Sequence, residues 1–451
     1  MIRTTSRLVL FVVLWSAASL AQAQDLASKF DAVLSGYQKN RSFIGSALIA
    51  KGGKVIFEKG YGMANVELDV PNGPDTKFRL GSITKQFTAT AILQLEEQGK
   101  LSVTDTACKY LPECPETWNA ITIHQLLSHT SGIPSYTDGP DFAKPKMMRI
   151  PLKPVEILML TKDKPLEFQP GEKWKYDNSG YIFLGVIIEK VSGEKYADYL
   201  KKHVFGALDM NDSGYDDSNI ILKNRAQGYR SVTDAFRNAD YLDMSLPYAA
   251  GSLYSTVNDL YRWDRALYTD KVLTKASREK MWTPVKNGYA YGWGVGQAHQ
   301  RKQISHGGGI NGFSTFIARY PDDDAVVIVL SNNERAAAGA IAGGLSGILF
   351  GEKVDLPWDR KEISIDAKIL DRYVGSYQAA QMTIDITSEN GHLMIEPKGQ
   401  RKLEAIATSE TEFFVKQVDA TLAFTLGPDN KATELRVVLG GSPMVAKRVN
   451  P

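Results

Sequence analysis

Strand patterns frame the first three quarters of this 451-residue chain and leave a helical stretch between them. Alternating apolar and polar residues over Phe43–Asn65 turn back at a Gly-Gly pair, which is typical of a β-hairpin. Similar patterns return at Tyr289–Val295, Ser314–Tyr320 and Ala325–Leu330, while helix signals fill Asp105–Lys280. Such sequence-distant strands predict an α+β fold: an antiparallel sheet flanked by helices, with an α-rich region inserted between its strands.

A second, smaller β domain is predicted after a polar stretch at Gly351–Lys368. Short strand candidates separated by turn signals follow at Arg372–Tyr377, Met382–Ile386, Leu393–Ile395, Phe413–Lys416, Thr421–Leu426, Glu434–Val438 and Met444–Arg448. Closely spaced strands of this kind indicate a small β-barrel or β-sandwich. The expected division is therefore a main domain at residues 24–352, a linker at 353–368 and a C-terminal β domain at 369–451.

The N-terminus has the pattern of a signal peptide at residues 1–23. Arg3 and Arg7 precede the apolar run Leu8–Leu20, and a small-x-small processing site ends at Ala23. The alternative is a transmembrane anchor, but the run is shorter than the roughly 18 apolar residues that span a bilayer. We therefore expect an exported protein, periplasmic or secreted after cleavage near Ala23, with no stable membrane span.

Charge and cysteine content limit the possible partners. Lys and Arg number 53 against 51 acidic residues, so bulk charge gives no reason to expect a nucleic-acid partner. The six histidines show no metal-binding spacing, and no phosphate or dinucleotide loop is present, so no cofactor is expected. Cys108 and Cys114 could form a small disulfide loop in an oxidising compartment, or remain two buried thiols.

Ser82 and Lys85 are the first candidates for chemistry. They open a helix predicted from Ser82 to about Gln98, whose apolar residues recur every fourth position. At positions i and i+3 the two side chains share one helix face, so a neutral Lys85 could take the Ser82 proton. The spacing occurs twice more, at Ser192–Lys195 and Ser277–Lys280, but those copies lie in polar or charged segments.

Two further segments supply the other groups that a serine nucleophile needs. Tyr176-Asp177-Asn178 offers a hydroxyl that can carry a proton and an amide that can bind substrate. His306-Gly307-Gly308-Gly309 offers a backbone that can approach an oxyanion closely. Each segment alone has a simpler explanation, a buried structural tyrosine in the first case and a turn in the second.

The three motifs together resemble the serine β-lactamase and penicillin-binding-protein superfamily, in its class C β-lactamase-like, esterase and D-peptidase branch. The resemblance extends over residues 43–332. It includes Phe78–Thr88, Gln125–Ile133, Pro170–Ser179, Ala250–Thr256 and Tyr291–Gly294. The C-terminal domain is similar to the lipocalin-like modules that accompany some members of this family.

The resemblance implies an acyl-enzyme mechanism. Ser82 would be the nucleophile, with Lys85 and Tyr176 as coupled general base and acid. Asn178 would contact the substrate amide, and the backbone amides of Ser82 and Gly309 would form the oxyanion hole. His306 would occupy a substrate-binding position.

The sequence departs from β-lactamases in the third motif, where they commonly have Lys-Thr-Gly and this chain has His306-Gly307-Gly308. A histidine is largely neutral at pH 7 and offers no fixed charge to a substrate carboxylate. We therefore expect an exported serine hydrolase of small esters or short D-amino-acid peptides, with carboxylate-bearing substrates improving as His306 becomes protonated. The alternatives are a β-lactamase or DD-carboxypeptidase acting on cell-wall material, and a catalytically silent ligand-binding protein. The sequence does not indicate an oligomeric state.

Overall fold

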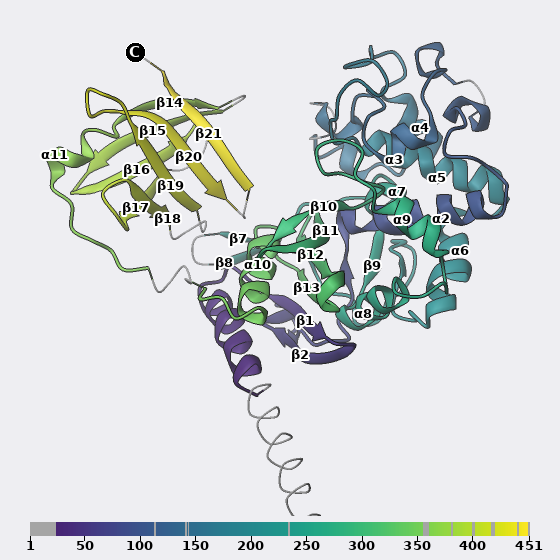
Figure 1. The fold of residues 1–451 in the computed structure, drawn as a ribbon, viewed down its shortest axis with the longest axis horizontal. Coiled ribbons are helices and arrows are strands. Elements are labelled where there is room, and N and C mark those ends of the chain that lie inside the picture. The colour runs from purple at the N-terminus through teal and green to yellow at the C-terminus, as the bar shows by residue number, and fades with distance from the viewer. Residues whose placement is uncertain are drawn as a thin grey trace, which may run out of the picture. The chain divides into compact units, whose positions relative to one another are not determined.

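The structure is a computed structural model that describes residues 24–111, 114–139, 142, 144–232, 235–354, 360–379, 382–398, 402–415, 420–439 and 442–449 (Figure 1). It forms two compact units, the first ending at Phe350 and the second beginning at Gly351. The expected signal peptide and part of the expected linker lie outside the described residues. Within the described ranges, no helix is both long and apolar enough to cross a membrane.

The first unit is built on a six-stranded antiparallel sheet with the strand order β10-β11-β12-β13-β1-β2. Its strands are β1 (Gly45–Lys51), β2 (Lys54–Tyr61), β10 (Gly294–Ala298), β11 (Arg301–Ile310), β12 (Phe313–Tyr320) and β13 (Ala325–Ser331). Strand β1 pairs with β13 from Gly45 opposite Ser331 to Lys51 opposite Ala325. Both ends of the unit therefore meet in one sheet, which confirms the predicted α+β arrangement.

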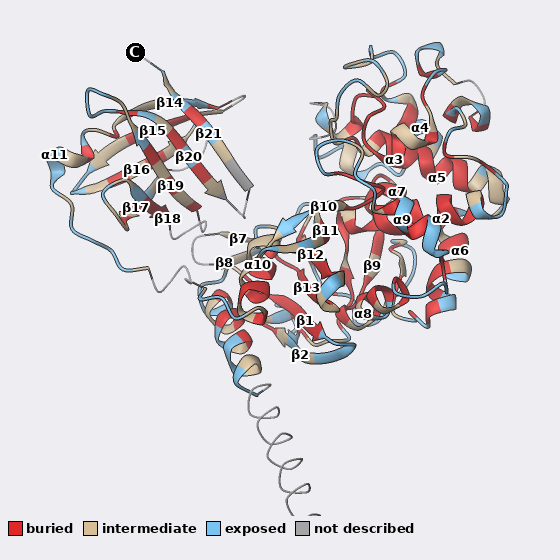
Figure 2. Ribbon diagram, viewed as in Figure 1, coloured by how far each residue is buried: buried red, intermediate tan, exposed pale blue. Residues whose placement is uncertain are grey.

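Helices cover this sheet and fill the inserted region (Figure 1). They comprise a helix over residues 24–39, α2 (Thr84–Glu97), α3 (Ile123–Leu127), α4 (Pro154–Met159), α5 (Asn178–Ser192), α6 (Tyr196–Leu200), α7 (Tyr248–Gly251), α8 (Val257–Ala266), α9 (Lys275–Met281) and α10 (Ala338–Leu349). Helices α10 and α8 pack against the sheet, while α2 packs against α5 and α7. Figure 2 shows α2 and α5 as largely buried, so both belong to the core of the unit.

Short strands join distant parts of the chain beside the sheet. They are β3 (Met63–Asn65) with β4 (Val70–Pro71), β5 (Phe78–Arg79) with β9 (Leu253–Ser255) and β6 (Gly214–Tyr215), and β7 (Tyr229–Val232) with β8 (Ala235–Asn238). The pairing of β5 with β9 holds the residues before α2 beside α7. This pairing places Ala250 close to the first turn of α2.

The second unit contains α11 (Ala367–Leu370) and a closed antiparallel barrel of eight strands. The strands are β14 (Gly375–Ala379), β15 (Met382–Glu389), β16 (His392–Pro397), β17 (Leu403–Ala407), β18 (Glu412–Val415), β19 (Ala420–Leu426), β20 (Ala432–Leu439) and β21 (Ser442–Val449). Pairing of β14 with both β15 and β21 closes the sheet, so the domain is a barrel and not a sandwich. Buried aromatic rings from Tyr373, Phe413 and Phe424 contact one another in its core.

Three strand predictions need correction. The expected strand at Tyr289–Val295 is wrong in its bounds, because β10 begins only at Gly294. Strand β11 was not expected, since its Ser-His-Gly-Gly-Gly run lacks the β-branched residues typical of strands and is held by pairing with β12. Strand β17 also escaped prediction. The open question about the cysteines is answered by a disulfide between Cys108 and Cys114.

Candidate active site

Ser82 lies in a 3-10 turn, η1 (Gly81–Ile83), that leads directly into α2. Gly81 has a φ of 54°, in the left-handed region that glycine adopts without strain. A Cβ atom at Gly81 would lie 3.0 Å from the backbone nitrogen of Gly309, so β11 passes very close to this turn. Ser82 itself is partly exposed, and its hydroxyl is therefore accessible.

Lys85 is fully buried one turn further along and makes three contacts through Nζ. They join Nζ to Oγ of Ser82 at 3.0 Å, Oδ1 of Asn178 at 2.9 Å and the carbonyl oxygen of Ala250 at 2.9 Å. Burial lowers the pKa of Lys85 to about 7, against a smaller raising effect of the Asp177 carboxylate. A substantial share of Lys85 is therefore a free amine near neutral pH.

The free amine of Lys85 matches these three contacts closely. A neutral amine has two N–H donors and one lone pair. The Asn178 and Ala250 oxygens are carbonyl acceptors, so they take the two donors. The lone pair is then left for the Ser82 hydroxyl, which is the arrangement that a general base requires.

Tyr176 covers the same amine from another side. Nζ of Lys85 lies 4.8 Å from the centre of the Tyr176 ring. Burial raises the pKa of the Tyr176 hydroxyl, and the neighbouring Ser82 hydroxyl lowers this pKa by a smaller amount. No hydrogen bond of good geometry joins this buried hydroxyl to another described residue. The hydroxyl is thus protonated at neutral pH and uncommitted, as a proton donor to substrate would be.

Asn178 begins α5 and is held on both sides. Its Oδ1 receives a hydrogen bond from Lys85, while its Nδ2 donates to Oγ1 of Thr137 at 3.1 Å. Its backbone N–H donates to Oγ of Ser135 at 3.2 Å. These contacts fix which end of the amide faces Lys85 and leave one N–H of the amide for a substrate carbonyl.

Asp177 lies inside the Tyr176-Asp177-Asn178 motif, but the sequence analysis gave it no role. Its carboxylate caps α5 by accepting the backbone N–H groups of Ser179 at 2.7 Å and Gly180 at 3.0 Å. Burial raises the pKa of Asp177 to about 7, although those hydrogen bonds and Lys85 act against the rise. The helix cap therefore orients the residues on either side of it, Tyr176 and Asn178.

His306 and Gly309 lie on β11 next to η1. His306 is 9 % exposed, its Nδ1 donates to the carbonyl oxygen of Gly307 at 2.6 Å, and its Nε2 accepts from the hydroxyl of Tyr289 at 2.9 Å. Burial and nearby Lys85 lower the pKa of His306 to about 4. His306 is thus neutral with both nitrogens engaged, whereas Gly309 is exposed beside Ser82. Direct contact of His306 with a substrate remains a prediction.

Steric crowding explains why the third motif has a glycine at position 308. A Cβ atom there would lie 1.9 Å from the carbonyl oxygen of Leu80 and 2.3 Å from Oγ1 of Thr315. Only glycine fits this close approach of β11 to the residues before Ser82. The motif therefore serves a strand contact and not the turn that its composition suggested.

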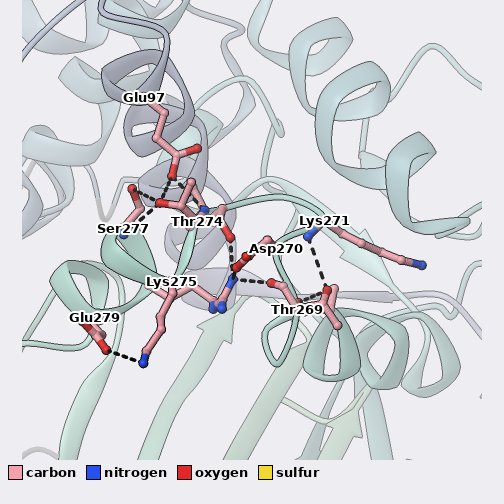
Figure 3. A network of polar contacts seen from close by, with 11 residues as sticks. Glu97, Thr269, Asp270, Lys271, Thr274, Lys275, Ser277 and Glu279 are labelled. Carbon is pink, nitrogen blue, oxygen red and sulfur yellow. Dashed lines mark hydrogen bonds and ion pairs between the residues drawn. The ribbon is translucent and has the colours of Figure 1, made fainter.

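The other two Ser-x-x-Lys copies have structural roles. Figure 3 shows Ser277 beside Thr274 and Glu97, where Oγ1 of Thr274 donates to Oε1 of Glu97 and caps α9 by accepting the backbone N–H of Ser277. Lys280 pairs with Glu96 at the surface and not with a serine. Ser192 ends α5 and contacts the backbone of Glu194 in a turn. Neither copy presents a buried lysine to its serine.

Sequence reasoning also missed His129 and Tyr289, which lie among the site residues. His129 is buried, and its ring centre lies 4.3 Å from that of Tyr176 and 4.6 Å from that of Tyr289. The sequence does place His129 in one of the segments that carry the resemblance, which was the only available signal. Over the described ranges, no group of three or more His, Cys, Asp or Glu side chains is arranged to hold a metal ion.

The fold and site define a serine hydrolase with a Ser-x-x-Lys motif. The chain belongs to the Beta-lactamase family, whose model matches residues 30–344, and the model of a Domain of unknown function (DUF3471) matches residues 359–447. The family resemblance seen in the sequence is thereby confirmed.

Among curated relatives, Penicillin-binding protein 4* of Bacillus subtilis is 35% identical over 417 residues, covering 87% of this chain and 92% of that protein. The octameric penicillin-binding protein homologue from Pyrococcus abyssi superimposes with a TM-score of 0.67 at 25% identity, covering 94% of this chain and 99% of that one. The D-amino acid amidase from Ochrobactrum anthropi SV3 has a TM-score of 0.64 at 21% identity, covering 72% of this chain and 99% of the amidase. The amidase likeness shows a shared fold alone.

Proposed function

We propose that this serine hydrolase cleaves small esters or short D-amino-acid peptides through an acyl-enzyme on Ser82. The observation that carries the proposal is the set of contacts around Lys85. Two carbonyl oxygens occupy its donors, so the lone pair of the free amine faces Oγ of Ser82 at 3.0 Å. A lysine so placed can accept the proton that a serine loses when it attacks a carbonyl carbon.

The proposed reaction has two balanced halves. Oγ of Ser82 bonds to the substrate carbonyl carbon as its proton passes to Lys85, and the backbone N–H groups of Ser82 and Gly309 stabilise the oxyanion. The bond to the leaving group then breaks, and that group receives a proton through Lys85 and Tyr176. Water next attacks the acyl ester, the same pair removes its proton, and Ser82 is released with its hydroxyl restored.

The charge distribution favours uncharged substrates. His306 is neutral and bonded to Tyr289, and it stands where β-lactamases commonly supply a lysine ammonium. A carboxylate next to the scissile bond would therefore lack a charged partner at this position. An ester or amide without that carboxylate loses nothing.

A cell-wall substrate is the second candidate, favoured by the 35% identity to Penicillin-binding protein 4* over most of both chains. A DD-carboxypeptidase or β-lactamase would use the same Ser82 chemistry on a different leaving group. A panel of aryl esters, D-amino-acid amides and peptides, and β-lactams on the purified protein separates the two. Higher kcat/KM on β-lactams or on peptides ending in D-Ala-D-Ala than on neutral esters would favour this second candidate.

Covalent labelling tests the proposal itself. A fluorophosphonate probe should label the protein once, and peptide mapping should place the label on Ser82. A folded protein that neither takes the label nor turns over any substrate of the panel would support the silent ligand-binding alternative instead.

We also propose that the protein acts outside the cytoplasm, after cleavage near Ala23. The disulfide between Cys108 and Cys114 supports this location, because such bonds persist in oxidising compartments. N-terminal sequencing of the protein recovered from a periplasmic or culture fraction would test the proposal, and an intact leader on a cytoplasmic protein would contradict it.

A further inference from the structure

His129 holds the backbone on both sides of Tyr176. The carbonyl oxygen of His129 accepts the N–H of Lys175 at 3.1 Å, and its ring atom Nδ1 accepts the N–H of Asp177, also at 3.1 Å. Tyr176 is the residue between these two amides. One residue from a different part of the chain therefore fixes the peptide units that carry the Tyr176 side chain.

The hydrogen bond to Asp177 sets the protonation of His129. Since Nδ1 accepts a hydrogen bond from the N–H of Asp177, it must carry the lone pair, and the ring proton of the neutral form lies on Nε2. Burial, together with Lys85 and His306, lowers the pKa of His129 well below its ordinary value. The acceptor at Nδ1 is therefore present at every pH at which the enzyme is expected to work.

Packing alone does not account for a histidine here. Its ring touches Tyr176 and Tyr289 as a phenyl ring could, yet Nε2 is buried with no hydrogen-bond partner among the described residues. Its backbone is also left-handed, with a φ of 58°, which a residue other than glycine adopts at a cost. A phenylalanine would avoid the buried unpaired N–H, so the feature that histidine has and phenylalanine lacks is the acceptor at Nδ1.

We propose that His129 is a positioning residue for the reaction, which fixes Tyr176 against Ser82 and Lys85 by accepting the N–H of Asp177. The inference rests on the proposed function, in which Tyr176 transfers a proton. His129 touches no reacting atom itself. Loss of its acceptor should therefore slow proton transfer while leaving substrate binding almost unchanged.

Two substitutions separate the acceptor from the ring. His129→Phe keeps a ring but removes the acceptor, whereas His129→Asn removes the ring but places Oδ1 about where Nδ1 was. Asparagine also tolerates the left-handed backbone. We expect His129→Phe to lower kcat for a small aryl ester, and the rate of fluorophosphonate labelling, at least about tenfold with KM within about threefold. His129→Asn should retain both rates within about threefold.

His124→Phe is the matched control. His124 lies in the same segment, on α3, and contacts Tyr291 instead of Tyr176. This variant should keep the wild-type rates. Circular dichroism and the melting temperature of every variant verify the fold, and His129→Leu replaces His129→Phe if the larger side chain prevents folding.

Three results would overturn the inference. The first is a folded His129→Phe or His129→Leu variant that labels at the wild-type rate. The second is a His129→Asn variant as slow as His129→Phe, because the ring and not the acceptor would then matter. The third is failure of both acceptor-free variants to fold, which would make the role purely structural. The proposed function fails separately, if the wild-type protein itself takes no label at Ser82.

Discussion

Nζ of Lys85 lies 3.0 Å from Oγ of Ser82, and the other two contacts of this nitrogen are carbonyl oxygens that can only accept hydrogen bonds. The protonated lysine donates to all three oxygens. The free amine has one donor fewer, so the Ser82 contact must then reverse and Ser82 must donate. Loss of one proton from Lys85 thus reverses this hydrogen bond, so that the Ser82 hydroxyl points its proton at the lone pair of the amine that is proposed to accept it.

Ser82→Ala should abolish acylation and lower turnover at least about a thousandfold, because it removes the only atom that bonds to the substrate. The fold should persist, since Ser82 is partly exposed in a short turn and alanine is smaller. Kinetics on an aryl ester and labelling by a fluorophosphonate measure the effect. Ser192→Ala is the matched control and should keep the wild-type rate. Substantial turnover by a natively folded Ser82→Ala variant would exclude Ser82 as nucleophile.

Tyr176→Phe should lower kcat by roughly a hundredfold or more, the usual effect of removing a general acid or base. KM and the melting temperature should change little, because the lost hydroxyl has no well-formed hydrogen bond to another described residue. Rapid-mixing kinetics would separate acylation from deacylation and show whether acyl-enzyme accumulates. Tyr241→Phe, at an exposed tyrosine, is the control. A Tyr176→Phe variant within about twofold of wild type in both steps would remove Tyr176 from the mechanism.

Asp177→Asn should shift the acid limb of the kcat/KM profile to lower pH. The wild-type limb is expected near pH 7, because Lys85 has a pKa of about 7 and is inactive as a base when protonated. The Asp177 carboxylate raises that pKa, so removing its charge lets Lys85 stay neutral in more acidic solution. We expect the acid limb to move by about half a pH unit or more. The pKa of Asp177 is itself raised to about 7, so this carboxyl is only partly ionised near the limb. Removing its charge therefore has a smaller effect than removing a fully ionised neighbour would have.

Asparagine is a good N-cap residue, but it keeps only one of the two oxygens that accept the N–H groups of Ser179 and Gly180, so the cap is retained in part. Asp138→Asn is the control, since Asp138 pairs with Lys175 at the surface and does not contact Lys85. The profile is measured as kcat/KM for an uncharged ester between pH 5 and 9. A limb that moves to higher pH, or stays in place, would contradict the assignment of the limb to Lys85.

The parts that the sequence predicted are those with a local signal. The hairpin at β1 and β2 follows from alternation around Gly52-Gly53, and α2 follows from apolar residues at every fourth position. The sequence analysis named Ser82, Lys85, Tyr176 and Asn178 because each belongs to a short motif, and the structure brings the four together. In all of these the residues that create the pattern are neighbours in the chain.

The parts that escaped prediction depend on contacts between distant residues. Strand β11 is specified by pairing with β12 and by the close approach of Gly308 to Leu80, neither of which its composition reveals. His129 gains its role from the N–H of Asp177, 48 positions away. Tyr289 likewise acquires its partner, His306, only when β11 is in place.

The pH behaviour expected of His306 also failed because it depends on contacts between residues that are distant in the sequence. From sequence, carboxylate-bearing substrates should improve as pH falls through an ordinary histidine pKa. Burial instead lowers the pKa of His306 to about 4, and both ring nitrogens already have partners. A cationic His306 is therefore absent throughout the range in which Lys85 can act as a base, and the expected improvement is removed with it.

The final prediction concerns substrate charge, and follows from this neutral His306. A substrate with a carboxylate beside the scissile bond should be slower than its neutral counterpart by roughly tenfold to a hundredfold in kcat/KM, on the order of 1–3 kcal/mol. Penicillins and cephalosporins should accordingly be poor substrates beside a small aryl ester. The ratio of kcat/KM for the charged substrate to kcat/KM for the neutral one should vary by no more than about twofold from pH 5.5 to 9. Protonation of Lys85 lowers both values by the same factor, so its effect cancels in the ratio. A ratio that improves steadily between pH 7 and 6, or nitrocefin turnover at the level of an efficient β-lactamase, would show that a cation does serve the carboxylate and would favour the β-lactamase alternative.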